Sequence, residues 1–181
     1  MTCIIAITKD GTVYMGGDSA ASESESGLIS TTKMPKVFKK DEYLIGYAGS
    51  FRMGKFIQYS VEFPKPPSWA KTPDKIDEFM NGHLIPHIRK QVKEHELEGG
   101  EKEEFNFIIG LRGSIFEIDD VWAAYEPATD YISIGSGSPV ALGSLYSTAG
   151  WSNPKKRIQI ALESASKYNI YVSAPFTLIE G

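Results

Sequence analysis

The chain has 181 residues, a formal net charge of −4 and 41% hydrophobic residues, values typical of a folded acidic protein. One cysteine excludes an internal disulfide, and with only three histidines a thiolate zinc cluster is excluded too. The acidic balance argues against a nucleic-acid partner, and no apolar run is long enough to cross a membrane. We therefore expect one domain over residues 1–181 in the cytoplasm.

The N-terminal third is predicted to be β-structure. Short apolar runs bounded by turn residues indicate strands over 3–7, 12–16, 36–40 and 43–47. The Asp10-Gly11 pair predicts a tight hairpin between the first two of these strands. The polar stretch 22–27 (SESESG) is typical of a surface loop.

The middle of the chain is predicted to be helical. Apolar residues recur at helical spacing over 51–61, and a second helix begins at Thr72-Pro73 and extends to Val92. Pro86 should kink or divide that second helix, because proline lacks a backbone donor and clashes with the preceding turn. The charged stretch 94–104 contains two glycines and predicts a loop.

The last third contains both strands and helices. Strands are expected over 105–111, 114–118, 121–125, 131–134 and 170–179. Helices are expected over 140–149 and 154–165. Strands and helices are grouped rather than alternating, so the pattern indicates an α+β protein and not a series of βαβ units.

Most familiar catalytic motifs are missing from the sequence. His83 and His87 share a helix face, but there is no HExxH motif, so we expect no metal. Gly135-Ser136-Gly137 is not a nucleophile elbow, and without a phosphate-binding glycine loop we expect no cofactor. Cys3 lies in the first strand, and its apolar neighbours are as compatible with a buried thiol as with a reactive one.

The N-terminus offers a different nucleophile. Loss of Met1 would leave Thr2 with a hydroxyl and a free α-amine, which titrates at about 7.7–8.0 and can act as the base. The first hairpin would return Asp18 to the neighbourhood of Thr2, and Lys36 opens a nearby strand. A bare backbone N–H at Gly49 could approach a developing oxyanion.

These residues carry a resemblance to a known family. The segments TCIIAITKDGTVYMGGDSAAS, KVFKKDEYLIGYAGS and YISIGSGSPVALG resemble the proteasome β-subunit and HslV family of N-terminal nucleophile hydrolases. Thr2 and Asp18 have the family's spacing, and Lys36 leads into a strand that ends in Ala48-Gly49. Lys33 is a rival for the lysine, and Lys36 is preferred because the strand after it fits without a gap.

The resemblance implies a fold and a set of functional residues. The fold is a four-layer αββα sandwich of two stacked sheets between helices. The implied activity is that of a threonine endopeptidase, with Thr2 as nucleophile after removal of Met1. The implied site residues are catalytic Thr2, Asp18, Lys36, Gly49 and Ser136, and substrate-binding Ala48 and Ser50.

The resemblance also implies partners. We expect a peptide or unfolded protein as substrate, a homo-oligomeric ring, and a separate ATPase unfoldase, because this chain has no phosphate-binding loop. The family carries an aspartate near the end of its last long helix, where this chain has Asn169 (or Lys167). Two alternatives stay open: a non-catalytic ring or scaffold subunit, and an amidase that acts on small amides.

Overall fold

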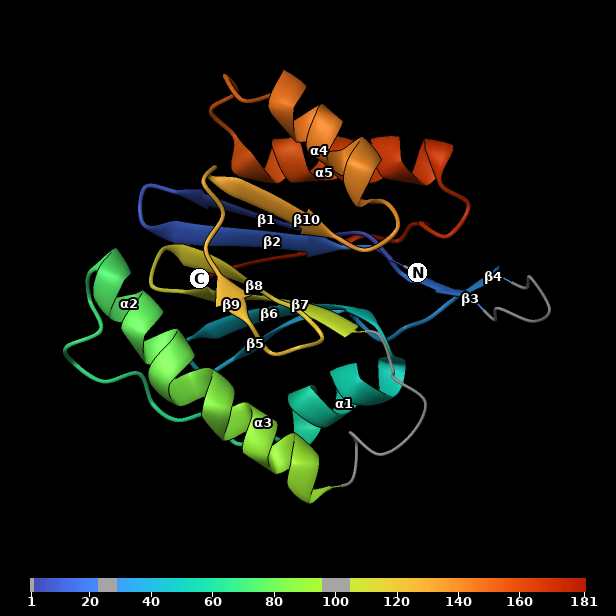
Figure 1. Ribbon diagram of the computed structural model, residues 1–181. Coiled ribbons are helices and arrows are strands. Elements are labelled where there is room, and N and C mark those ends of the chain that lie inside the picture. Colours follow the sequence, from blue (N-terminus) through green and yellow to red (C-terminus); the bar gives the residue numbers. More distant parts are fainter. Residues whose placement is uncertain (1, 23–28, 96–104) are drawn as a thin grey trace.

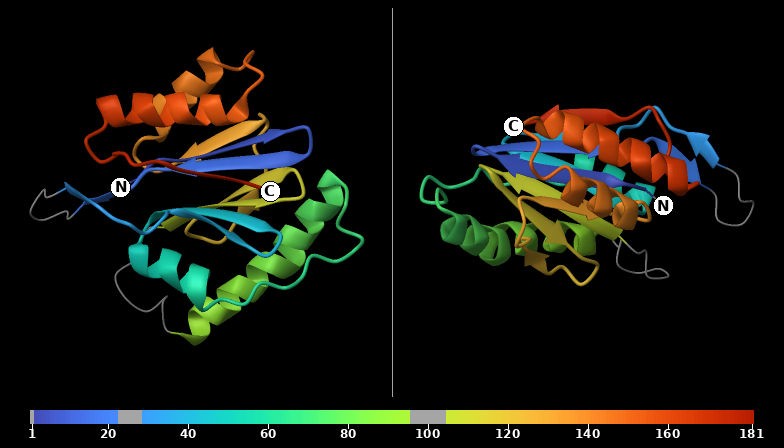
Figure 2. Two further views of the ribbon diagram at one scale, coloured as in Figure 1. Left: turned by 180° about the vertical axis from the view of Figure 1, so that it is seen from behind. Right: turned by 90° about the horizontal axis from the view of Figure 1, so that it is seen from above.

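A computed structural model describes residues 2–22, 29–95 and 105–181. Two antiparallel sheets lie face to face, and helices cover the outer face of each sheet (Figures 1 and 2). This is the four-layer αββα arrangement that the resemblance implied, and the predicted fold class is confirmed. No described helix combines the length and apolarity needed to cross a membrane.

Each layer is built from a few elements. The first sheet has the order β10 (Tyr131–Ile134), β1 (Ile4–Lys9), β2 (Thr12–Gly17) and β11 (Thr177–Glu180). The second has the order β5 (Val37–Lys40), β6 (Tyr43–Gly49), β7 (Phe105–Leu111), β8 (Ser114–Ile118) and β9 (Ala124–Tyr125). Helices α4 (Ser138–Ser147) and α5 (Pro154–Tyr168) cover the first sheet. The second is covered by α1 (Phe51–Tyr59), α2 (Pro73–Phe79), the π-helical turn η1 (Met80–Leu84) and α3 (Ile85–Glu94).

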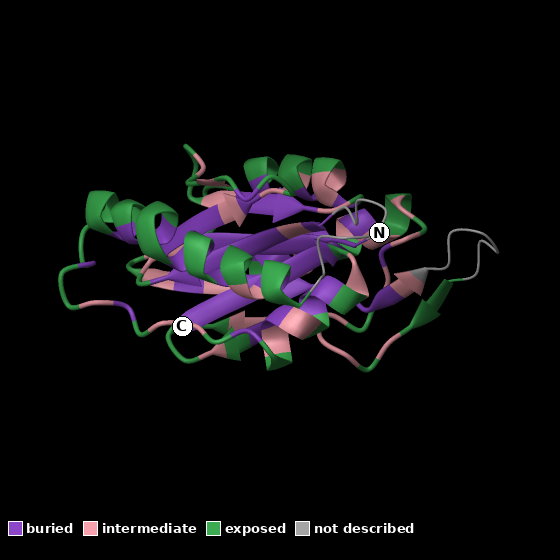
Figure 3. Ribbon diagram, turned by 60° about the horizontal axis from the view of Figure 1, so that its bottom comes forward, coloured by how far each residue is buried: buried purple, intermediate pink, exposed green. Residues whose placement is uncertain are grey.

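Strand β1 shows how the layers are held together. Ile5 and Ile7 pack against the outer helices, whereas Ile4 and Ala6 face the second sheet. Successive side chains of a strand point to opposite faces, so a strand covered on both sides is apolar throughout. Figure 3 shows the result, with buried strands between helices whose outer faces are exposed. The hydrophobic effect on both faces therefore holds the residues next to Thr2 in a rigid frame.

The first hairpin brings Asp18 back to the N-terminal end of the chain. Asp10 (φ 51°) and Gly11 (φ 76°) form the predicted tight turn, and both left-handed residues suit a type I′ hairpin. The register pairs Ile4 with Gly17, and the Asp18 N–H donates to the Cys3 carbonyl at 3.2 Å. Local turn chemistry thus sets a contact between positions fifteen residues apart.

A π-helical turn interrupts the regular α-helical geometry near Pro86, whereas the sequence predicted a kink or a division there. The π-helical turn η1 lies between α2 and α3 and ends two residues before the proline, and the Ile85 N–H bonds to the Met80 carbonyl. A wider turn removes the need for the donor that proline lacks and relieves its clash with the preceding turn. The three segments still form one continuous rod under the second sheet (Figure 1).

Two predicted strands are wrong over most of their length. In 121–125 only Ala124–Tyr125 pairs as β9, because Trp122 has a φ of 67° and the Asp119 carboxylate holds the chain in a turn through the N–H groups of residues 121 and 123. Of 170–179 only the last three residues lie in a strand, β11 (Thr177–Glu180), since the segment before it turns to hydrogen-bond Ser19 and Asp18.

A short two-stranded ribbon lies next to the first predicted loop. Strands β3 (Ala20–Ser22) and β4 (Ile29–Thr31) pair as a short ribbon that extends from the body of the molecule (Figure 1) and was not predicted. The loop predicted over 22–27 lies almost entirely outside the described residues, as do 96–104 of the loop predicted over 94–104.

Candidate active site

Thr2 lies at the end of the first sheet, immediately before β1. Its side chain is inside the protein, with 2% of the residue exposed. Its carbonyl accepts a hydrogen bond from the Gly137 N–H at 3.0 Å, which ties it to the turn that leads into α4. The pairing of β1 with β2 and β10 on either side fixes the direction in which the chain arrives.

Lys36 joins Thr2 to Asp18. Its Nζ lies 2.7 Å from Thr2 Oγ1 and 2.9 Å from Asp18 Oδ1, and it stands 5.8 Å from the centroid of the Phe51 ring. Both charged residues are 1% exposed, so the ion pair is buried. Burial lowers the pKa of Lys36, and the Asp18 carboxylate opposes that shift. Lys33, the rival lysine, is exposed, and the structure places Lys36 at the threonine hydroxyl.

The Asp18 carboxylate is held by backbone donors as well as by Lys36. Oδ1 also accepts from the Cys3 N–H at 3.0 Å, and Oδ2 accepts from the N–H groups of Ala20 (2.9 Å) and Ser173 (3.4 Å). Hydrogen bonds to an ionised acceptor are among the stronger ones in proteins. The carboxylate therefore orients Lys36 from a fixed position. The sequence analysis did not identify Ala20 or Ser173, because backbone donors leave no signal in residue type.

Ser136 lies on the other side of Thr2. Its Oγ accepts a hydrogen bond from the Thr2 nitrogen at 3.3 Å. Gly135, the residue before it, has a φ of 90°, and a Cβ there would lie 2.3 Å from the Thr2 carbonyl oxygen. The glycine is thus required by backbone conformation and by close approach together. The turn can carry a serine hydroxyl to Thr2 only because its neighbour has no side chain.

Asn169 supports the Ser136 turn from the end of α5. Its Nδ2 donates to the Ser136 carbonyl at 2.7 Å, and its Oδ1 accepts from the Tyr171 N–H at 2.9 Å. Lys167, the other position aligned with the family's aspartate, is exposed in the last turn of the helix. Asn169 is therefore the residue of the two that reaches the site.

Gly49 lies on the strand next to Lys36. The Tyr47 N–H donates to the Lys36 carbonyl at 3.0 Å, which places the end of β6 alongside the lysine. Gly49 is exposed and has a φ of 92°, a backbone conformation that residues with a side chain rarely adopt. This strand end is consequently accessible to a ligand from outside.

The two predicted substrate-binding residues are engaged in other contacts through their side chains. Ala48 is 5% exposed and packs in the core between the sheets. The Ser50 hydroxyl accepts from the Met53 N–H at 3.1 Å and caps α1. The structure thus links Asp18, Lys36, Thr2 and Ser136 through direct contacts, and places Ala48 and Gly49 at the end of the adjoining strand with Ser50 at the start of α1.

Cys3 follows the candidate nucleophile but is a buried thiol. It is fully buried, its Sγ lies 3.8 Å from Ser133 Oγ, and burial raises its pKa from 9.0 to about 12. Little thiolate is then present at pH 8, because burial disfavours the charged form of the thiol.

We accordingly predict that maleimide labels Cys3 at pH 8 at least about 100-fold more slowly in the native protein than in urea. Mass spectrometry over time measures both rates. Equal rates would show that the thiol is accessible in the folded chain and would reverse this assignment.

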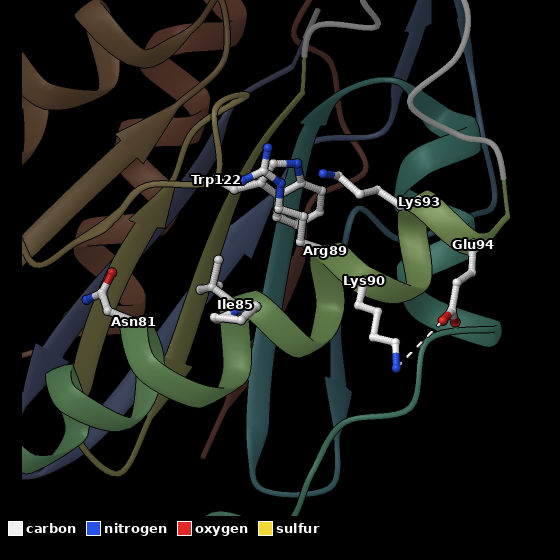
Figure 4. Close-up of a pocket in the computed structure, with 8 residues that line it drawn as sticks. Asn81, Ile85, Arg89, Lys90, Lys93, Glu94 and Trp122 are labelled. Atoms are coloured by element: carbon white, nitrogen blue, oxygen red, sulfur yellow. Dashed lines mark ion pairs between the residues drawn. The ribbon is translucent and has the colours of Figure 1, made fainter.

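A separate groove lies along η1 and α3. It has a volume of about 390 Å³, and Arg89 and Lys93 extend along it towards the Trp122 ring (Figure 4). Lys90 pairs with Glu94 at 3.8 Å on its outer side. None of the residues that line it was predicted as a site residue. Across the described residues, no group of three or more His, Cys, Asp or Glu side chains could hold a metal.

The sequence is similar to two kinds of curated protein. It is 28% identical over 183 residues to a proteasome subunit beta of Frankia alni, covering 96% of this chain and 60% of that one. It is 22% identical over 182 residues to the ATP-dependent protease subunit HslV of Syntrophobacter fumaroxidans, covering 99% and 95%. The chain thus spans less than two thirds of the Frankia protein. No protein-family model matches it.

The fold is shared with a solved HslV. The structure of eukaryotic HslV from Trypanosoma brucei superposes with a TM-score of 0.72 at 20% identity, over 99% of this chain and 98% of that one. At this identity the likeness shows the fold alone. Together with the two sequence matches, it makes the chain similar in sequence and in fold to proteasome β-subunits and HslV.

Proposed function

We propose that residues 1–181 form one threonine endopeptidase domain whose nucleophile is Thr2, active once Thr2 is the first residue of the chain. The observation that carries this proposal is the buried chain of contacts from Asp18 Oδ1 through Lys36 Nζ to Thr2 Oγ1, at 2.9 and 2.7 Å. An ammonium beside a hydroxyl favours its deprotonated form, and a buried carboxylate keeps the ammonium in place.

The proposed reaction begins with attack on a peptide carbonyl. Thr2 Oγ1 bonds to the carbonyl carbon as its proton passes to the free α-amine of the same residue. The carbonyl oxygen becomes an oxyanion, which the Gly49 N–H is proposed to stabilise, with Lys36 maintaining positive charge beside Oγ1. Ser136 Oγ, 3.3 Å from the Thr2 nitrogen, would hold the amine in position throughout.

The second half of the reaction releases both products. The tetrahedral intermediate collapses, the peptide C–N bond breaks, and the leaving amine takes the proton held by the α-ammonium. The acyl group remains as an ester on Thr2. Water then attacks this ester with the α-amine again as base, which frees the carboxylic acid and restores the hydroxyl. No step requires a metal or a cofactor.

The proposal extends to assembly and partners. The names of the two relatives describe subunits of larger particles, one of them ATP-dependent. We accordingly propose that this chain forms a homo-oligomeric ring in the cytoplasm, cleaves peptides or unfolded proteins, and receives them from a separately encoded ATPase.

Substitution Thr2→Ala is expected to abolish hydrolysis of a fluorogenic peptide and of casein. It removes the attacking oxygen and leaves the backbone of residue 2 in place. Loss of a catalytic nucleophile typically lowers the turnover number by about 10⁴- to 10⁶-fold. Thr2→Ser keeps the hydroxyl and should retain measurable turnover. Intact-mass measurement of each protein shows whether Thr2 is the first residue.

Three outcomes would redirect the proposal. Full activity of the Thr2→Ala protein would exclude Thr2 as nucleophile. Turnover of small amides but not of peptides would favour the amidase. A wild-type chain that retains residue 1 and hydrolyses nothing would favour the scaffold subunit, because an acylated nitrogen cannot act as base.

A further inference from the structure

The orientation of the Asn169 amide is determined by its two partners. The Tyr171 N–H can only donate, so it must meet the amide oxygen, and the Ser136 carbonyl can only accept, so it must meet the amide nitrogen. Both bonds are short, at 2.9 and 2.7 Å. The side chain therefore acts as a donor towards the Ser136 turn and as an acceptor towards its own loop.

The backbone of Asn169 is itself well anchored. Its N–H bonds to the Ala165 carbonyl in the last turn of α5 at 2.9 Å, and its carbonyl accepts from the Val172 N–H at 3.1 Å. Ala165 and Val172 are both buried under the first sheet. The amide thus extends from a rigid helix end, which is what a side chain needs in order to position another group.

Two hydrogen bonds tie the Ser136 turn to Thr2 and to the end of α5. The Gly137 N–H donates to the Thr2 carbonyl on one side, and the Ser136 carbonyl accepts from Asn169 on the other. Ser136 itself is exposed, so no core packing fixes its hydroxyl. These two bonds, together with the bond from the Ser138 N–H to the Gly135 carbonyl at 3.0 Å, hold the turn that directs Oγ towards the Thr2 nitrogen.

We propose that Asn169 is a positioning residue that holds Ser136 Oγ against the Thr2 nitrogen, and that this task requires an amide rather than a carboxylate. An ionised aspartate has no donor, so its oxygen would face the Ser136 carbonyl oxygen and repel it. The position aligned with the family's aspartate therefore works here through the opposite hydrogen-bond polarity. The kinetic form of this inference rests on the proposed peptidase activity.

The sharpest test is the isosteric substitution Asn169→Asp in the full chain with Thr2 as first residue. We expect the turnover number for a fluorogenic peptide to fall about 10- to 100-fold with KM within about twofold, as for a small misplacement of a reacting group. Asn169→Ala loses both hydrogen bonds, so its turnover number should fall at least as far. Lys167→Ala, two residues away on the same helix end, should leave both constants unchanged. Wild-type rates in the Asn169→Asp protein would overturn the inference.

Crystal structures separate this inference from the proposed function. In the wild-type and Lys167→Ala proteins Ser136 Oγ should remain within hydrogen-bond distance of the Thr2 nitrogen, and in the Asn169→Asp protein it should move beyond 3.5 Å. If the wild-type protein has no hydrolysis that depends on Thr2, the proposed function fails and this distance still decides the inference. An unmoved Ser136 in the Asn169→Asp protein would contradict it.

Discussion

Substitution Lys36→Met is expected to abolish peptide hydrolysis and to lower the free energy of unfolding by about 3–5 kcal/mol. Lys36 and Asp18 form a buried ion pair, so removal of the cation leaves the carboxylate inside the protein without its countercharge. The same change removes the donor that lies 2.7 Å from Thr2 Oγ1. Urea unfolding measures the first effect and a fluorogenic peptide assay measures the second.

A double substitution separates the two effects. Asp18→Asn combined with Lys36→Met removes both charges, and replacement of a buried ion pair by neutral groups is often close to neutral for stability. The double variant should therefore recover the part of the lost stability that comes from the unpaired charge while it stays inactive. Recovery is incomplete, because the amide nitrogen introduced by Asp18→Asn cannot accept the backbone N–H bonds that one carboxylate oxygen accepts. Lys33→Met is the matched control, because Lys33 is exposed and its replacement should change the unfolding free energy by less than about 0.5 kcal/mol. If Lys33→Met loses activity and Lys36→Met retains it, the lysine role belongs to Lys33 and the assignment to Lys36 is wrong.

Substitution Gly135→Ala is expected to destabilise the protein by about 2–4 kcal/mol and to reduce hydrolysis at least about 100-fold. The new Cβ would lie 2.3 Å from the Thr2 carbonyl oxygen and 2.8 Å from its carbonyl carbon, both rigid backbone atoms. The φ of 90° adds backbone strain for any residue with a side chain. Thr2 or the Ser136 turn must move to relieve the contact, and either movement separates the Thr2 nitrogen from Ser136 Oγ.

Gly143→Ala in α4 is the control for this substitution. No atom lies within 4 Å of a Cβ built at Gly143, and alanine is favoured over glycine in a helix by about 0.8–1 kcal/mol. Thermal unfolding should therefore show a rise in stability for Gly143→Ala and a fall for Gly135→Ala. If both substitutions stabilise the chain, the close approach of Gly135 to Thr2 is not present in solution.

Much of the candidate site could be predicted because it depends on local structure. The Asp10-Gly11 turn sets the register of the first hairpin, and the register sets Asp18 beside Cys3. Lys36 immediately precedes β5, which pairs directly with β6 and so leads to Gly49. Each of these steps involves neighbouring strands and short turns, whose rules can be read from residue type.

The wrongly predicted segments are those whose backbone conformation depends on contacts with residues far away in the sequence. Residues 170–176 contain apolar residues and were predicted as a strand, yet they turn because their backbone groups bond to Ser19 and Asp18, more than 150 positions earlier. Trp122 adopts a left-handed conformation that its residue type does not suggest. Nothing in the local pattern of either segment indicates these contacts, because a backbone donor is the same in nearly every residue.

The sequence by itself determined most of the order of strands and helices, the first hairpin, and the residue types of the proposed threonine nucleophile with its lysine and aspartate. Only the tertiary structure decided that Lys36 and not Lys33 meets Thr2, that Asn169 and not Lys167 reaches Ser136, and that Asn169 does so as a donor. The physical reason is that hydrogen-bond polarity and burial depend on where two distant segments meet. That meeting is set by the packing of both sheets and their covering helices together.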